Sequence, residues 1–239
     1  MSESAGQAEK SLASVDSAGQ NHQLSQTQLR FFHTFGYLLL SGRFSEDIGE
    51  IGNAFDQVMA APDNGSVPLA YSDGGRSMVP CMLDQHPTLN ALKSDPRITA
   101  IADSIIGDGW VYAESAGDLL ECETTWHRDT YGTPLTQFSI KLLFYMEPLT
   151  ASTGALRVMP GTHYFRGGYV KDVLRGQGFP DRMQETFGVA ADTIPAVAVE
   201  TNPGDVVVLN FRTVHASFAG SGIKRRLLNI NYREPTKPE

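Results

Sequence analysis

Cysteine is scarce in this sequence. The 239 residues contain only Cys81 and Cys122, and neither has a partner at the spacing of metal ligands. Structural zinc sites and disulfide-rich secreted domains need more cysteines than this. The amino terminus also lacks the apolar core of a signal peptide. We therefore expect reduced thiols and a cytoplasmic protein.

Long apolar runs and an excess of basic residues are missing as well. No stretch approaches the roughly 18 apolar residues of a membrane-spanning helix. Lys and Arg total 19 against 27 Asp and Glu, which gives a formal net charge of −8. An acidic chain is poorly suited to neutralising nucleic-acid phosphates. These absences favour a small-molecule substrate over nucleic acid or membrane, and they leave the oligomeric state open.

The order of patterns along the chain predicts one large domain. Residues 1–22 are rich in Ser, Ala, Gly and Gln, with little to bury, and are expected to form a disordered leader. A single domain is expected over 23–234, with helices between 25 and 106 and strands between 110 and 232. The segment 166–191 lacks the alternation of a strand and is expected to form a lid over the pocket.

Local signals place the expected helices. Ser25 followed three residues later by Gln28 has the spacing of a capping box, and Gly36 is a typical helix end. The sequence therefore predicts a first helix between Ser25 and Gly36. A second helix is expected from about Ser45. Asp95, followed by a proline, predicts the start of a third.

Strand signals dominate after residue 110. The run 138–146 is apolar on both faces, which predicts a central strand. Two further strands are expected at 110–114 and 118–125, because Gly117 and several acids interrupt the alternation. The acids are expected on solvated strand faces; they are Glu114, Asp118, Glu121 and Glu123.

Two segments carry candidate metal ligands. In an extended chain, His127 and Asp129 share one face of the backbone. On its own, the pair also fits a strand end with a surface histidine and a solvated aspartate. The segment 202–217 reads as a turn and a buried strand that lead to His215, a second imidazole. Two imidazoles and one carboxylate bind a divalent metal and leave coordination positions open, as in non-haem Fe(II) oxygenases.

Basic residues supply candidates for an anionic co-substrate. A 2-oxo acid that chelates the metal needs a cation for its far carboxylate, and a guanidinium matches that group best. Arg225 and Arg226 face opposite sides of a strand, so only one can face the metal, and Arg226 is the candidate. Lys141 is the charged exception in the run 138–146. If it faces inward, it could contact the oxo acid or an anionic substrate.

These residues sit in a pattern that resembles the phytanoyl-CoA dioxygenase family of Fe(II)- and 2-oxoglutarate-dependent oxygenases. The matching pieces follow family order and include Gly36-Tyr37-Leu38, Trp126-His127-Arg128-Asp129, Thr153-Gly154-Ala155-Leu156, Pro160-Gly161-Thr162-His163, Pro203-Gly204-Asp205 and His215-Ala216-Ser217. The resemblance implies a mainly β fold with flanking helices. Its core would be a double-stranded β-helix, a cupin-like jelly roll.

The resemblance also implies roles for single residues. His127, Asp129 and His215 would bind Fe(II) and form the catalytic centre. Arg226, the eleventh residue after His215, would bind the far carboxylate of 2-oxoglutarate, and Ser217 would hydrogen-bond the same carboxylate. The implied cofactors are Fe(II), 2-oxoglutarate and O2. Possible substrate contacts in the loop 61–80 are Tyr71, Arg76 and Met78.

The function expected from this resemblance is oxidation of an unactivated C–H bond in a small metabolite or natural-product intermediate, with release of succinate and CO2. Hydroxylation, desaturation or ring closure is expected rather than halogenation, because Asp129 fills the position that relatives leave vacant for a halide. One alternative is a metal-dependent jelly-roll hydrolase or isomerase that does not use 2-oxoglutarate. The other is a non-catalytic binding protein, against which the intact ligand set argues.

Overall fold

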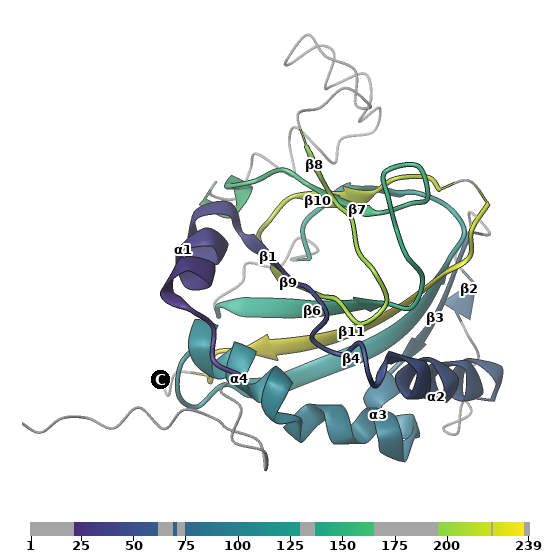
Figure 1. The fold of residues 1–239 in the computed structure, drawn as a ribbon, viewed down its shortest axis with the longest axis horizontal. Helices are drawn as coiled ribbons and strands as arrows, with labels where there is room; N and C mark the ends of the chain where they lie inside the picture. The colour runs from purple at the N-terminus through teal and green to yellow at the C-terminus, as the bar shows by residue number, and fades with distance from the viewer. Residues whose placement is uncertain are drawn as a thin grey trace, which may run out of the picture.

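The computed structural model describes residues 22–61, 69–70, 75–129, 137–164, 196–220 and 222–236. Within these ranges the strands form two antiparallel sheets that enclose a pocket, and helices cover the outer face of the larger sheet (Figure 1). The chain is therefore mainly β with flanking helices, arranged as a jelly roll. Residues 1–21 of the expected leader and the expected lid at 166–191 lie outside the described ranges.

The larger sheet has seven strands. Their order across the sheet is β1 (Tyr37–Leu40), β9 (Val206–Asn210), β6 (Ser139–Tyr145), β11 (Arg225–Arg233), β4 (Val111–Leu120), β3 (Arg76–Pro80) and β2 (Leu69–Ala70). The smaller sheet has the order β5 (Thr124–His127), β10 (His215–Ser217), β7 (Leu156–Val158) and β8 (Val197–Val199). The predicted run 138–146 is confirmed as a central strand, β6, between β9 and β11.

Helices occupy the amino-terminal part of the domain. They are α1 (Gln26–Phe35), α2 (Ile48–Ala60), α3 (Pro87–Ala91) and α4 (Pro96–Ile105), with short 3-10 turns at Met82–Gln85, Leu92–Ser94 and Thr162–Tyr164. None of the helices in the described ranges has the length and apolar character of a transmembrane span.

The predicted caps are confirmed. The Ser25 hydroxyl accepts from the backbone N–H of Gln28, the Gln28 side chain accepts from the backbone N–H of Ser25, and Gly36 ends α1 in the left-handed region at φ 80°. Asp95 caps α4 through the backbone N–H of Arg97. The second helix begins at Ile48, later than expected from Ser45.

Alternation along β6 divides the core into two apolar layers. Ile140, Leu142 and Phe144 pack under the helices. Leu143 and Tyr145 face the smaller sheet. Both faces of β6 are apolar because helices cover one of them and the smaller sheet covers the other.

The expected break at Gly117 is wrong. β4 runs without interruption from Val111 to Leu120. A Cβ at Gly117 would lie 2.8 Å from the sulfur of Met82 and 2.9 Å from the ring of Phe55. The glycine therefore lets these two side chains pack closely on the sheet, and it does not end the strand.

Candidate metal centre and its pocket

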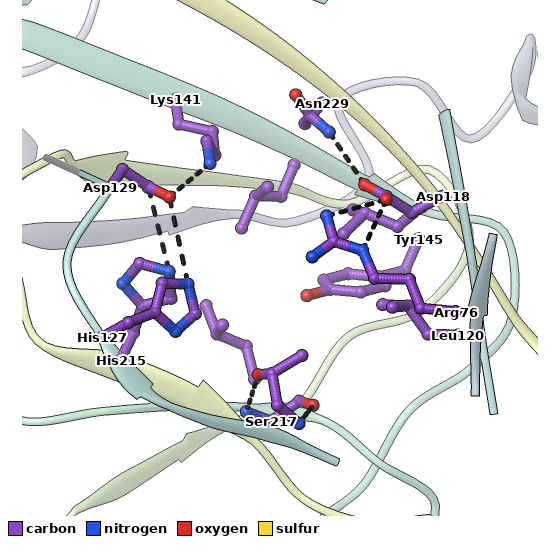
Figure 2. A pocket seen from close by; sticks show the side chains of 14 residues that line it. Arg76, Asp118, Leu120, His127, Asp129, Lys141, Tyr145, His215, Ser217 and Asn229 are labelled. Carbon is purple, nitrogen blue, oxygen red and sulfur yellow. Dashed lines mark hydrogen bonds and ion pairs between the residues drawn. The ribbon is translucent and has the colours of Figure 1, made fainter. Parts of the chain in front are cut away.

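A pocket opens between the two sheets, and the candidate metal ligands form one side of it (Figure 2). Its lining residues are Arg76, Asp118, Leu120, Thr124, His127, Asp129, Lys141, Leu143, Tyr145, Leu156, His215, Ser217, Leu227 and Asn229. Both sheets contribute, so the pocket is the interior of the jelly roll.

His127, Asp129 and His215 come together as a cluster. His127 ends β5 and is paired in register with His215, the first residue of β10. Asp129 follows two residues after His127, and its backbone N–H donates to the carbonyl of Phe211 at 3.1 Å. The potential ligand atoms of the three residues all lie within 4.8 Å of one another. The strand pairing thus converts two distant sequence segments into one candidate site.

Hydrogen bonds turn both imidazoles toward Asp129. The Nδ1 atoms of His127 and His215 lie 2.7 Å and 2.9 Å from the backbone carbonyls of Thr125 and Thr213. An Nδ1–H that donates to a carbonyl leaves the lone pair on Nε2. These Nε2 atoms lie 4.0 Å and 3.8 Å from the carboxylate of Asp129.

Asp129 carries the atom that marks this cluster as a cation site. Its Oδ1 accepts from the Lys141 ammonium at 2.7 Å, whereas its Oδ2 is buried and has no hydrogen-bond partner among the described residues. A buried carboxylate oxygen without a partner is costly, and a metal ion would satisfy it. The donor set of two imidazoles and one carboxylate fits Fe(II) with open positions for further ligands.

The local electrostatics keep the cluster ready to bind a cation. Burial lowers the pKa of His127 to about 3 and also lowers the pKa of His215, so both imidazoles are neutral. Burial alone would raise the pKa of Asp129, but the Lys141 ammonium and the two imidazoles outweigh it and hold that pKa at about 2. Metal binding at neutral pH therefore needs no proton to leave.

Arg226 does not reach the pocket, in contrast to its expected place there. It pairs in register with Leu119 on the outer face of the sheet. Its Nε and Nη1 atoms donate to Glu147 at 2.6 Å and to Asp56 of α2 at 2.7 Å. The residue count from His215 suggested the wrong face, because pairing with β4 decides which arginine points inward.

Arg225 occupies the inward face instead. It pairs in register with Leu120, which lines the pocket, and it is completely buried; Arg225 itself is not one of the lining residues. Its guanidinium donates to the backbone carbonyls of Gly154 at 2.7 Å, Phe218 at 3.2 Å and Cys122. Within the described ranges its Nε has no hydrogen-bond partner, and no acidic side chain forms an ion pair with it.

Ser217 and Lys141 both line the pocket, as their expected roles require. The Ser217 hydroxyl accepts from the backbone N–H of Thr124 at 2.9 Å. Lys141 faces inward from β6, as considered from the sequence, and its described ion pair is with Asp129.

The expectation of a solvated Asp118 is wrong. Its side chain is only 1% exposed, and it lies in the pocket wall between Arg76 and Asn229. Arg76 was a possible substrate contact and does line the pocket, whereas Met78 does not. Tyr71 lies outside the described residues. The sequence does contain one sign that Asp118 faces inward. It lies two residues before the apolar Leu120, so the two side chains share one face of a strand.

Comparisons with known proteins agree with this architecture. The family model described as phytanoyl-CoA dioxygenase (PhyH) matches residues 32–227. No curated protein sequence matches the chain. Among solved structures, the non-heme alpha-ketoglutarate-dependent carbocyclase SnoK from nogalamycin biosynthesis has a TM-score of 0.72 at 23% identity, covering 88% of this chain and 84% of that one.

Two other neighbours were crystallised with 2-oxoglutarate. HygX from Streptomyces hygroscopicus, with nickel and 2-oxoglutarate bound, has a TM-score of 0.69 at 16% identity and covers 90% of this chain and 89% of that one. EctD from S. alaskensis, with 2-oxoglutarate and 5-hydroxyectoine, has a TM-score of 0.66 at 19% identity and covers 88% and 76%. At these identities the neighbours establish the fold.

Proposed function

Because the chain belongs to the phytanoyl-CoA dioxygenase family, we propose that it is an Fe(II)- and 2-oxoglutarate-dependent oxygenase that oxidises a small molecule. The observation that carries this proposal is the buried, unpartnered Oδ2 of Asp129, which lies beside two neutral imidazoles. A site built for binding neutral ligands would not leave this anion unsatisfied.

His127, Asp129 and His215 would hold the iron. Three protein ligands leave positions for a bidentate oxo acid and O2, and iron with these two partners supplies the oxidising chemistry. The protein itself fixes the ligands and excludes water. Both imidazoles are oriented by backbone carbonyls, and His215 and Asp129 are only 5% and 6% exposed.

Arg225 is the residue that we assign to the far carboxylate of 2-oxoglutarate. It is a buried cation with no acidic partner in the described part of the chain, and a carboxylate would supply both the missing charge and an acceptor for its Nε. It also lies close enough to Tyr145 in the pocket wall to lower the pKa of that phenol, against the larger effect of burial. Ser217, on the pocket wall, is the proposed neutral donor to the same carboxylate.

Lys141 is assigned to Asp129 and not to the oxo acid. Its ammonium occupies Oδ1, which leaves Oδ2 for the metal. Lys141 would therefore act as a positioning residue that holds the carboxylate in one orientation.

The proposed outcome is oxidation of a C–H bond, with hydroxylation as the simplest case and conversion of 2-oxoglutarate to succinate and CO2. SnoK is described as a carbocyclase, and another structural neighbour from nogalamycin biosynthesis, SnoN, is described as an epimerase. Similar folds therefore catalyse more than one type of reaction. Desaturation and ring closure therefore stay within the proposal. Halogenation does not, because Asp129 fills the third protein position.

Succinate formation tests the proposal. The wild-type protein should convert 2-oxoglutarate to succinate only when Fe(II) and O2 are present, and Asp129→Ala should abolish this turnover. The matched control is Asp108→Ala, which removes an exposed aspartate outside the pocket. Near-normal turnover in Asp129→Ala would refute the ligand assignment. A protein that binds the metal but has no affinity for 2-oxoglutarate would favour the hydrolase or isomerase alternative.

A further inference from the structure

Three polar side chains form a wall of the pocket across from the metal cluster (Figure 2). The Nε and Nη2 atoms of Arg76 each lie 2.8 Å from Oδ1 of Asp118. The side-chain amide of Asn229 donates to Oδ2 of the same carboxylate at 3.1 Å. We call Arg76, Asp118 and Asn229 the polar wall.

The proposed chemistry gives this polar wall no task. The metal is assigned to the cluster on the opposite side, and the far carboxylate of 2-oxoglutarate is assigned to Arg225 and Ser217. Asp118 is nevertheless buried, and burial raises its pKa even though Arg76 opposes the change. An apolar pair in its place would fill this part of a jelly roll at a lower cost in desolvation.

The charge of the polar wall narrows the substrates that it can bind. The guanidinium of Arg76 and the carboxylate of Asp118 cancel each other at contact distance. A carboxylate on the substrate would be attracted by Arg76 but repelled by Asp118, and an ammonium would meet the reverse. A neutral group avoids both penalties.

The hydrogen-bonding capacity of the polar wall narrows the choice further. Asp118 offers acceptors, Arg76 offers donors, and the amide of Asn229 offers both. A hydroxyl both donates and accepts, so two neighbouring hydroxyls match such a surface better than a ketone or an ether. The carbon skeleton would meet the apolar side chains beside the wall, namely Leu120, Leu143 and Leu227.

We propose that the polar wall binds a pair of neighbouring hydroxyl groups on a neutral, otherwise aliphatic substrate. The hydroxyls anchor the molecule at Asp118 and Arg76, and the adjoining carbons are thereby held toward His127, Asp129 and His215. This inference rests on the proposed function, because it takes the cluster to be the reacting end of the pocket. It makes the polar wall a determinant of both specificity and the position of oxidation.

Three probes with the same ring test the choice of head group: cis-cyclopentane-1,2-diol, cyclopentanecarboxylate and cyclopentylamine. Each is titrated into protein loaded with Mn(II) and 2-oxoglutarate, which cannot turn over. Binding near the paramagnetic ion shortens the relaxation times of the probe protons, so the measurement reports both affinity and location. The wild-type protein should bind the diol most tightly, with its ring protons close to the metal.

Two charge variants should change this preference in opposite directions. Asp118→Asn removes the carboxylate that repels an anionic probe, so the carboxylate probe should gain affinity and the diol should lose about tenfold. Arg76→Gln removes the guanidinium that repels a cationic probe, so the amine probe should gain affinity instead. The matched control is Glu114→Gln, which removes an acid from the same strand outside the pocket and should leave all three affinities unchanged.

The outcomes separate this inference from the proposed function. If neither Mn(II) nor 2-oxoglutarate binds the wild-type protein, the proposed function fails first. If both bind but the diol is not preferred, or if its affinity is unchanged in Asp118→Asn and Arg76→Gln, the assignment of the polar wall is wrong. Melting temperatures of the variants show whether they are folded. Arg76→Gln is the safer variant, because that side chain is 29% exposed.

Discussion

Arg225 and Arg226 are consecutive residues whose guanidinium groups lie on opposite faces of β11. Arg225 is completely buried on the inward side, beside Leu120, while Arg226 points outward to Asp56 and Glu147. The outward arginine already has two acidic partners. Among the described residues, the inward arginine donates to backbone carbonyls only, and this difference leads to the first prediction.

Removal of Arg225 should weaken binding of 2-oxoglutarate, and removal of Arg226 should not. A charge-assisted hydrogen bond contributes roughly 1.5–3 kcal/mol, so we expect Arg225→Met to raise the dissociation constant by about 10- to 100-fold. Calorimetric titration of the Mn(II)-loaded variants measures this. Arg226→Met is the matched control at the neighbouring position. A larger loss of affinity in the control would return the role to Arg226.

The Arg225 side chain should keep its position only if residue 154 is a glycine. Its φ is 97°, and a Cβ there would lie 2.7–2.8 Å from the Arg225 side chain. Gly154→Ala should therefore cost about 1–3 kcal/mol of stability and displace the guanidinium, lowering 2-oxoglutarate affinity. Gly222 has a φ of 74° with no atom within 4 Å of such a Cβ. Gly222→Ala should lower stability through backbone strain but leave the affinity for 2-oxoglutarate unchanged. Denaturant unfolding measures the stability, and calorimetry measures the affinity.

Loss of the Lys141 ammonium should weaken metal binding. Lys141 holds one oxygen of Asp129, and changes to such supporting partners typically lower metal affinity about 10- to 100-fold. In Lys141→Met the affinity for Mn(II) should fall by this factor. Electron paramagnetic resonance of Mn(II) measures the affinity. The exposed ion pair of Lys224 with Glu121 provides the control, Lys224→Met. Tighter Mn(II) binding in Lys141→Met would mean that repulsion between the Lys141 ammonium and the metal ion outweighs the benefit of holding Asp129 in place.

The metal-free protein should lose stability as the pH falls below about 6.5. Burial keeps His127 and His215 neutral in the folded state, whereas the unfolded chain protonates both near pH 6.5. The unfolded state then binds more protons, so at pH 5 each imidazole should cost up to about 2 kcal/mol of unfolding free energy. Urea titrations at pH 5 and 7.5 measure the difference. The double variant His127→Gln, His215→Gln should depend less on pH, and an unchanged slope would contradict the assignment.

Features set by neighbouring residues could be read from the sequence. The Ser25 cap, the apolar run of β6 and the shared face of His127 and Asp129 depend on a few adjacent positions. These signals are local, because capping and strand alternation repeat over two to four residues. They were enough to predict the jelly roll and to bring three candidate ligands together once the family resemblance was added.

Features set by distant pairing could not be read in this way. The inward arginine depends on the register of β11 against β4, and a residue count from His215 does not include that register. Asp118 was expected in solvent because its partner, Arg76, is 42 residues earlier in the chain. Gly117 looked like a break because Met82 and Phe55, which need its empty space, come from other elements.

The place of β11 has a consequence for how a newly made chain matures. β11 is the last described strand in chain order, yet it runs between β4 and β6 in the middle of the larger sheet. While the ribosome is still adding residues 225–233, β4 and β6 present open edges that invite pairing with other chains. Iron loading should accordingly follow translation, because the cavity closes only after its central strand has been inserted.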